Sequence, residues 1–300
     1  MATYNGAPYL RAQLMSFAAQ RHANWSLRIR DDGSRDETLE VIDTFCREHP
    51  ERDITVTAAA PGGSSAANFL NLLAAGDWPE GACLALSDQD DVWMAHRLKR
   101  ALSFLAGQEG PQIYASRTIL MDETGRSLRL SRRHPRVPAF ENALVQNILA
   151  GNTIILDPAA ADLARRTARA ALAHRVPHHD WWLYQVMTGA GGRVVLDQRP
   201  GVYYRQHQGN VLGANQGVSK GLTRFAMLWR QEYSAWIDAN LAALQATGDA
   251  LLPENAALVR RFARWRLGGA HRGTLRDMGV WRQTAQGDRL LALSARLGRL

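Results

Sequence analysis

The chain has 300 residues, 46% of them hydrophobic, and a formal net charge of +8. This size and composition fit one large globular domain, or a domain with an extension. Cys46 and Cys83 are the only cysteines, so we exclude a disulfide framework and a cysteine zinc site. No apolar run nears 18 residues, so we exclude a membrane-spanning helix. No secretory signal is visible, and with so few cysteines we expect a cytoplasmic protein.

The first 105 residues alternate short apolar runs with helical patterns. A strand end at residues 1–3 is followed by predicted strands at 25–30, 53–58 and 84–87. Helices are predicted between them and after them, at about 8–20, 35–49, 68–75 and 93–105. This order predicts an α/β fold, a mostly parallel sheet flanked by helices. Polar loops 3–6, 31–34, 62–68 and 88–91 should then meet at one rim of the sheet.

Three carboxylates follow the last of these strands. Asp88 and Asp90 leave the strand end on the same side, and Asp91 comes directly after them. Clustered carboxylates repel one another unless a cation lies among them, and such oxygen ligands suit Mg²⁺ or Mn²⁺. An acidic loop or a helix cap is the alternative interpretation. Asp31 and Asp32 end the second strand, where they could either bind a nucleoside or cap the next helix.

Residues 112–217 are less regular. Strands are predicted at 112–116, 119–122, 151–156, 193–196 and 202–207, and helices at 140–149, 158–172 and about 180–187. Asp180 begins the last helix and is a candidate general base, with His178 and His179 as alternatives. Trp181 and Trp182 could form a platform for a sugar ring, or could be core residues behind a helix cap.

The composition changes near residue 217. Residues 219–300 contain 13 Lys and Arg against 6 Asp and Glu, and they carry Trp229, Trp236, Trp265 and Trp281 among predicted helices at 219–247 and 254–267. A basic helical tail of this kind favours an anionic membrane surface, whereas nucleic acid is not expected as a partner. A solvated basic face is the alternative interpretation. His207 closes the strand before this change and could be a metal ligand through its neutral imidazole.

Several motifs, in this order along the chain, resemble the inverting glycosyltransferases of family two, which have the nucleotide-diphospho-sugar transferase fold called GT-A. The motifs are residues 2–6, 31–38 and 87–93, while residues 179–182 and 204–211 look like the rhamnosyltransferase branch. The resemblance covers residues 2–215. It implies a GT-A domain at 1–217 and a basic helical extension at 218–300. Members begin with a full apolar strand, so we expect a start upstream of Met1 or a missing first strand.

The resemblance also implies roles for individual residues. The nucleotide sugar would contact Thr3, Tyr4, Asn5, Asp32 (or Asp31), Asn68 and Asp88. A divalent metal would be held by Asp88, Asp90, Asp91 and His207. Asp180 matches the catalytic base, and Gly151 and Asn152, with Trp181 and Trp182, would lie on the acceptor side.

The expected activity is metal-dependent transfer of a sugar with inversion. The donor would be dTDP-L-rhamnose, and the acceptor a lipid-linked precursor of a bacterial surface polysaccharide, met at the inner face of the plasma membrane. Two alternatives stay open at this point. The sequence from Asp88 to Val92 also fits the motif of haloacid-dehalogenase-type phosphatases, in which the first Asp attacks phosphate. The chain could also be an inactive homologue that only binds a nucleotide sugar.

Overall fold

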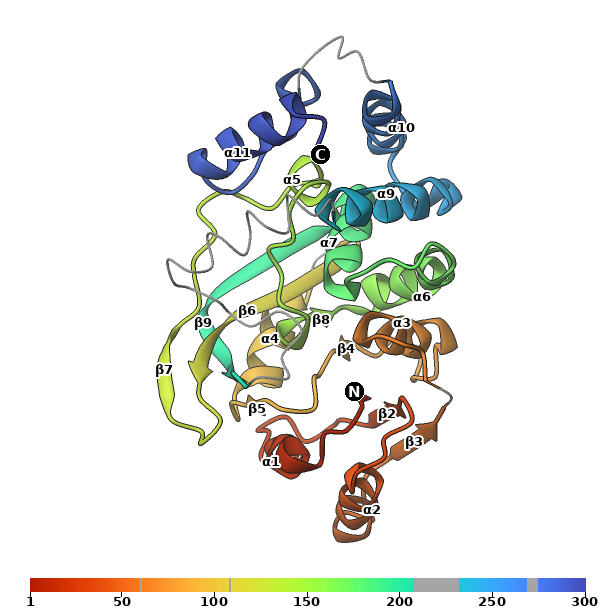
Figure 1. The fold of residues 1–300 in the computed structure, drawn as a ribbon. Helices are drawn as coiled ribbons and strands as arrows, with labels where there is room; N and C mark the ends of the chain where they lie inside the picture. Colours follow the sequence, from red (N-terminus) through yellow and green to blue (C-terminus); the bar gives the residue numbers. More distant parts are fainter. Residues whose placement is uncertain (60, 108, 208–231, 269–274) are drawn as a thin grey trace.

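A computed structural model describes residues 1–59, 61–107, 109–207, 232–268 and 275–300 (Figure 1). The N-terminal part alternates strands and helices as predicted. Its elements are β1 (Ala2–Thr3), α1 (Ala7–Ala18), β2 (Leu27–Asp31), α2 (Thr38–Glu48), β3 (Ile54–Ala58) and α3 (Ser65–Ala75). The strands form a parallel sheet in the order β1-β2-β3. Helix α1 covers this sheet because Leu10, Leu14 and Phe17 recur on one helical face and are buried.

A second, mixed sheet adjoins the first. Its order is β4-β8-β6-β9-β5, and β7 pairs antiparallel with the C-terminal residues of β6, 119–121. The strands are β4 (Leu84–Ala85), β5 (Val92–Trp93), β6 (Gln112–Met121), β7 (Ser127–Leu130), β8 (Ile155–Leu156) and β9 (Arg193–Arg205). The two sheets meet where the Ala2 amide donates to the Ser87 carbonyl at 3.4 Å. The placement of the fourth strand in the parallel sheet was wrong, because β4 pairs antiparallel with β8.

Two pairs of predicted strands are single long strands. Strand β6 joins the predicted strands at 112–116 and 119–122 and ends at Met121, and β9 joins those at 193–196 and 202–207 and ends at Arg205. The two pair in parallel, with register shifts on either side of Arg117, which lies opposite Pro200. Proline has no amide hydrogen to donate, so the ladder bulges there without ending. The polar break in each sequence was this irregularity and not a loop.

Other predicted boundaries moved as well. Trp93 lies in β5, and helix α4 begins only at Arg97 and ends at Leu105. The predicted strand at 151–156 is a 3₁₀ turn, Gly151–Thr153, followed by β8, and the helix at 140–149 is reduced to α5 (Phe140–Ala143). Helix α6 (Pro158–Ala173) agrees with its prediction, since Asp157 caps it and Pro158 occupies its first turn.

The remaining helices share one apolar core. They are α7 (His179–Gly189), α9 (Glu232–Gln245), α10 (Pro253–Leu267) and α11 (Ala285–Arg296), with 3₁₀ turns at Gly248–Ala250 and Leu275–Met278. Trp182 and Tyr184 of α7 are fully buried with Ile237 of α9 and Phe262 of α10. Figure 1 shows α10 and α11 at the end of the molecule opposite the β1–β3 sheet. In the part of the chain that the structure describes, no helix is long and apolar enough to cross a bilayer.

Candidate active site

The predicted meeting of the polar loops is confirmed by hydrogen bonds between them. The Gln89 side chain accepts from the Tyr4 amide at 2.8 Å and donates to the Tyr4 carbonyl at 2.9 Å. We call this pair of hydrogen bonds the Gln89 clasp. Gly6 leaves room for it, because a Cβ at residue 6 would lie 2.3 Å from Gln89 Oε1. The loop after β1 and the loop after β4 are therefore held together by one side chain between Asp88 and Asp90.

Asp31 holds the first two loops together. Its carboxylate is fully buried and accepts from the Thr3 hydroxyl at 2.9 Å and from the Gly33 and Ser34 amides at 3.1 and 2.8 Å. The Ser34 hydroxyl adds a bond of 2.6 Å. In this arrangement Asp31 and Thr3 shape the loops from within. Direct contact of either side chain with a nucleotide stays a prediction.

Asp32 and Asn68 join the second and third loops. Arg30 donates to Asp32 Oδ1 at 2.7 Å and to Asn68 Oδ1 at 2.8 Å, and the Gly62 amide donates to Asp32 at 2.7 Å. The Asn68 amide group donates to the carbonyls of Thr3 and Arg30, both at 3.2 Å. Both side chains are buried, so a ligand could reach Asn68 only by displacing these bonds.

Tyr4 and Asn5 lie at the surface of the same rim. The Tyr4 side chain is 53% exposed, and Asn5 has a positive φ of 47°, a conformation that asparagine tolerates better than most residues. The Asn5 side chain accepts from the Arg35 amide at 2.8 Å. Of the residues assigned to the nucleotide pocket, Tyr4 and Asn5 are the two exposed to solvent.

Acidic side chains from distant parts of the chain gather at the rim. Burial and the charges of Asp90 and Asp180 raise the pKa of Asp88 to about 7. Asp180 lies in the first turn of helix α7. Because its charge acts on Asp88, the start of α7 must lie near the loop after β4. The site thus combines carboxylates that repel one another, the arrangement that a cation or a proton relieves.

His207 faces this cluster from the end of β9. Its Nε2 lies 2.7 Å from Asp90 Oδ2, and its ring packs 5.0 Å from that of Tyr9 in α1. Arg205 fixes the strand end, since its side chain donates to the Asp90 carbonyl at 2.9 Å and its amide donates to Asp91 at 3.1 Å. The structure thus places His207 beside the acidic motif, and its role as a metal ligand stays a prediction.

Asp91 differs from Asp88 and Asp90 in its surroundings. It is fully buried, and its two oxygens accept from Asn152 Nδ2 at 2.5 Å and from the Arg205 amide. Burial and the charges of Asp90 and Asp88 raise the pKa of Asp91 well above its usual range. In this arrangement both Asp91 oxygens accept hydrogen bonds from the fold, and the expectation that Asp91 is a further metal ligand stays a prediction.

Asp180 is half-buried in the first turn of α7. Its Oδ1 accepts from the Trp181 amide at 2.7 Å, and its other oxygen has no bond of this kind among the described residues. A Cβ on Gly151 would come within 2.6 Å of His179 Nε2 and 3.5 Å of Asp180 Cβ, so this glycine allows the 151–153 turn to pack on α7. Gly151 and Asn152 are buried beside Asp180 and Asp91 respectively.

The aromatic platform expected at Trp181 and Trp182 was wrong. Trp181 is 3% exposed and donates from Nε1 to the Ala143 carbonyl at 2.6 Å, and Trp182 is fully buried. Neither offers a free ring face to a sugar. His179 is also inside: it stacks on Phe69 with ring centroids 4.0 Å apart, and burial lowers its pKa to about 4.

The donor set fits a divalent metal of a particular kind. Asp88 and Asp90 supply hard oxygens, and His207 supplies an imidazole. Within the described residues, no group of three or more His, Cys, Asp or Glu is arranged to hold a metal by itself. Mg²⁺ and Mn²⁺ are commonly held by one or two carboxylates together with substrate phosphates. The residues present therefore fit a metal that a diphosphate ligand completes.

Sequence reasoning missed three residues that build the site. Gln89 and Arg205 lie inside or beside the recognised motifs, but their roles depend on partners far along the chain. Arg97 is 1% exposed, stacks 3.8 Å over the Trp93 ring and donates to the Asn152 carbonyl at 2.5 Å. Burial lowers its pKa to about 9, against the opposing effect of Asp91. The only signal was an arginine at a helix start, where a cation is unfavourable.

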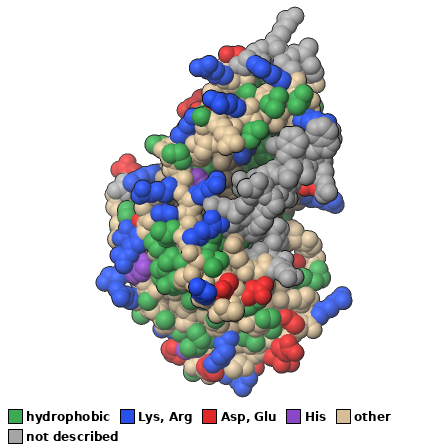
Figure 2. Space-filling model, turned by 60° about the vertical axis from the view of Figure 1, so that its left-hand side comes forward, with side chains coloured by type: hydrophobic (Ala, Val, Ile, Leu, Met, Phe, Trp, Pro, Cys, Tyr) green, Lys and Arg blue, Asp and Glu red, His purple; other side chains and the backbone are tan. Residues whose placement is uncertain are grey.

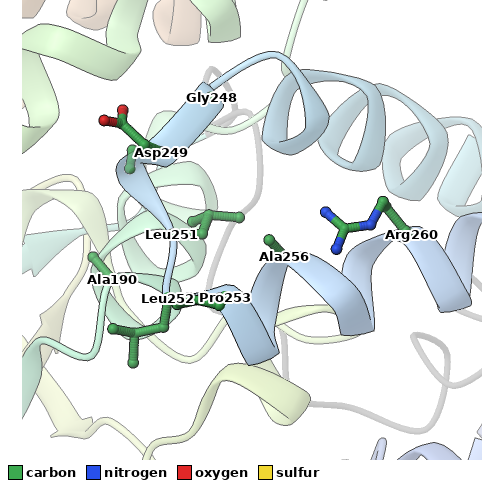
Figure 3. Close-up of a pocket in the computed structure, with 9 residues that line it drawn as sticks. Ala190, Gly248, Asp249, Leu251, Leu252, Pro253, Ala256 and Arg260 are labelled. Carbon is green, nitrogen blue, oxygen red and sulfur yellow. The ribbon is translucent and has the colours of Figure 1, made fainter.

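A separate depression of about 580 Å³ lies at the turn between α9 and α10 (Figure 3). It is lined by Ala190, Gly248, Asp249, Ala250, Leu251, Leu252, Pro253, Ala256 and Arg260. None of these belongs to the four rim loops, so this depression is not part of the carboxylate site.

The sequence of the chain is similar to those of known proteins. The family model Glycosyl transferase family 2 matches residues 1–161. The dTDP-rhamnosyl transferase RfbG of Shigella flexneri is 26% identical over 238 residues, which are 78% of this chain and 80% of that protein. The Escherichia coli protein WfgD, named UDP-Glc:alpha-D-GlcNAc-diphosphoundecaprenol beta-1,3-glucosyltransferase, is 29% identical over 105 residues, 35% of this chain and 39% of that protein.

Solved structures resemble the whole arrangement. The crystal structure of S. aureus TarS 1-349 has a TM-score of 0.52 at 18% identity and covers 99% of this chain and 90% of that one. Its complex with UDP-GlcNAc has a TM-score of 0.50 at 15% identity. The chain spans 51% of a longer TarS chain. With the family match, these likenesses confirm the predicted GT-A fold with helices at the C-terminal end.

Proposed function

The chain belongs to glycosyl transferase family 2, and we propose that it transfers L-rhamnose from dTDP-L-rhamnose to a hydroxyl of a lipid-linked surface polysaccharide precursor, with inversion. The donor is supported by the similarity to a dTDP-rhamnosyl transferase. The acceptor class is supported by the similarity to WfgD, whose name contains a diphosphoundecaprenol acceptor. Family membership makes the phosphatase alternative wrong, because the Asp88 motif lies within the matched residues.

The observation that carries the proposal is the convergence of Asp180 with Asp88 and Asp90. Asp180, at the start of α7, packs against Gly151, and the next residue, Asn152, donates to Asp91 in the acidic motif at 2.5 Å. The charges of Asp90 and Asp180 both raise the pKa of Asp88. A sugar transfer needs two functions at one place. One is a base for the acceptor hydroxyl, and the other is a positive charge on the leaving diphosphate. A half-buried carboxylate beside a metal-binding pair supplies the residues for both.

In the proposed reaction, Asp180 accepts the proton of the acceptor hydroxyl. The hydroxyl oxygen forms a bond to the anomeric carbon while the bond from that carbon to the diphosphate oxygen breaks. The electron pair of the broken bond stays on the nucleoside diphosphate, which leaves. A single displacement of this kind inverts the anomeric carbon. The Trp181 amide donates to Asp180 Oδ1 at 2.7 Å and holds the carboxylate in one orientation, which leaves Oδ2 for the proton.

Asp88, Asp90 and His207 are the residues that we assign to a divalent cation. A bound Mg²⁺ or Mn²⁺ supplies positive charge that offsets the charge on the diphosphate. On this side of the site, Gln89 holds the loop of Tyr4 and Asn5 against the acidic motif. The same rim would thus receive the nucleoside and the diphosphate together.

The proposed location is the cytoplasmic face of the plasma membrane, where a lipid-linked acceptor would be met. The basic composition of residues 219–300 supports attraction to an anionic surface. We divide the chain accordingly into a catalytic part, residues 1–217, and a basic extension, residues 218–300. The extension packs directly on the catalytic part, since α9 and α10 share the core of α7.

Transfer can be measured with a panel of nucleotide sugars. The purified protein is incubated with dTDP-L-rhamnose, UDP-glucose or GDP-mannose, Mg²⁺ or Mn²⁺, and a membrane lipid extract as acceptor. We expect labelled sugar in the lipid fraction from dTDP-L-rhamnose, and loss of that label with a chelator. Transfer from another donor alone would refute the rhamnose assignment. Donor binding without transfer or hydrolysis would instead identify a binding homologue.

Asp180→Asn tests the base. The amide keeps the shape of the side chain but cannot take the proton, so kcat should fall about 10²- to 10⁴-fold while donor binding stays nearly unchanged. Asp249→Asn, at an exposed position outside the rim, is the matched control and should behave like the wild type. Turnover by Asp180→Asn at the wild-type rate would remove Asp180 as the base.

A further inference from the structure

Helix α11 exposes apolar side chains that face away from the core. Leu290, Leu293 and Leu297 are 43%, 47% and 59% exposed. Their spacing of three and four residues places them on one side of the helix, and we call them the leucine stripe. Leu291 and Ala295 face the core from another side of the helix. The stripe is therefore not needed to attach α11 to the protein.

Arginines border this stripe. Arg289 and Arg296 are exposed, and each lies three or four residues from Leu293, so both flank the stripe along the helix. Asp288, the acidic residue of α11, is already paired with Arg136 at 2.9 Å and accepts from the Arg282 amide at 2.6 Å. Figure 2 shows Lys and Arg side chains beside hydrophobic ones over the upper part of the molecule, the end where α11 lies.

The tryptophans of the extension are not the exposed apolar groups. Trp236 meets the His178 ring edge-on with centroids 4.7 Å apart, and Trp265 stacks on Phe262 at 6.0 Å. Trp281 lies 5.1 Å from the Arg136 guanidinium. All three are half-buried. Trp229 lies outside the described residues. The packing of these three indoles leaves the leucines of α11 as the more exposed apolar side chains of the described extension.

We propose that α11 lies on an anionic lipid surface, with the leucine stripe among the acyl chains and Arg289 and Arg296 against lipid phosphates. A helix with an apolar side and basic neighbours binds the interface in this way. The inference deepens the proposed function, which places the acceptor in a membrane. A second copy of the chain fits the stripe less well, because pairing two such faces would bring their arginines together.

The test measures binding of the full chain to vesicles of phosphatidylcholine with and without phosphatidylglycerol, by co-sedimentation. We expect binding to the anionic vesicles that weakens as salt is raised. Leu290→Gln/Leu293→Gln/Leu297→Gln should lower the partition coefficient about tenfold or more, because the transferred apolar area is lost. Arg289→Gln/Arg296→Gln should lower it about tenfold for anionic vesicles and leave binding to neutral vesicles unchanged.

Leu128→Gln/Leu130→Gln is the matched control, since these leucines of β7 are 53% and 46% exposed but lie outside the extension. Wild-type binding by the triple leucine variant, or an equal loss in the control, would overturn the proposal. So would a wild-type dimer that this variant disperses without any vesicle binding. Transfer to a soluble acceptor should survive in the triple variant. If the wild type binds vesicles but transfers no sugar, the proposed function is refuted and the proposed membrane contact of α11 is not.

Discussion

Protonation of His179 should destabilise the helix start that carries Asp180. The ring is 8% exposed and stacks on Phe69, and its Nε2 has no hydrogen-bond partner among the described residues. Burial therefore lowers its pKa from 6.5 to about 4. In the unfolded chain the ring is hydrated, and its pKa returns to the ordinary value. The folded protein thus keeps His179 neutral under conditions in which the unfolded chain takes up a proton.

The sign and size of the effect follow from this difference. Above the unfolded pKa of 6.5 neither state is protonated, so the full stability is present. As the pH falls from 6.5 towards 4, only the unfolded state gains a proton, and the free energy of unfolding decreases. Integrating this linkage from about pH 7.5 to about pH 5 gives a loss of ~2 kcal/mol from His179 alone.

Urea unfolding at these two pH values measures the loss. Other buried groups also titrate, so the quantity of interest is the difference between the wild type and His179→Gln, whose side chain does not charge. The pH-dependent loss should be ~2 kcal/mol smaller in His179→Gln. His174→Gln, at an exposed position, should leave the pH dependence unchanged. If His179→Gln loses as much stability between the two pH values as the wild type, the buried-neutral account of His179 is refuted.

Two further substitutions test the rim. Gln89→Ala removes both bonds to the Tyr4 backbone, each worth ~1 kcal/mol, and should raise the donor KM about tenfold or more with a smaller change in kcat. Gln89→Glu can accept but not donate, so its donor KM should lie between those of the wild type and Gln89→Ala. An unchanged KM for Gln89→Ala would contradict the role of Gln89 in holding the Tyr4 loop. Asp90→Ala should weaken metal-dependent donor binding measured by calorimetry with Mn²⁺. His49→Ala, remote from the rim, serves as its control, and equal binding by both variants would remove Asp90 as a metal residue.

Much of the rim was predictable because its signals are local. A strand ending in polar residues places those residues at the sheet edge, whatever the rest of the chain does. The four loops and the proximity of His207 to the acidic motif were found in this way. The two sheets were not. Strand β4 pairs antiparallel with β8, which lies far along the chain. The sequence of a run as short as Leu84–Ala85 does not predict whether its partner strand is parallel or antiparallel.

Burial separated the residues that sequence patterns treat alike. Asp88, Asp90 and Asp91 belong to one motif, yet only Asp91 is fully buried, because Asn152 and Arg205 bind its oxygens. Adjacent aromatic residues after Asp180 could have been a platform or a core. Both indoles lie inside because the first turn of α7 points Asp180 to the rim and turns the following residues into the core.

The sequence by itself determined the family motifs, the alternation of strands and helices, and the basic character of the C-terminal part, since each depends on neighbouring residues. Only the tertiary structure brought Asp180 into the neighbourhood of Asp88, closed the Gln89 clasp on Tyr4, and turned the leucines of α11 outward while Trp236, Trp265 and Trp281 became half-buried. These relations depend on which distant surfaces pack together. The free energy of that packing comes from contacts throughout the core, so no single position in the sequence predicts it.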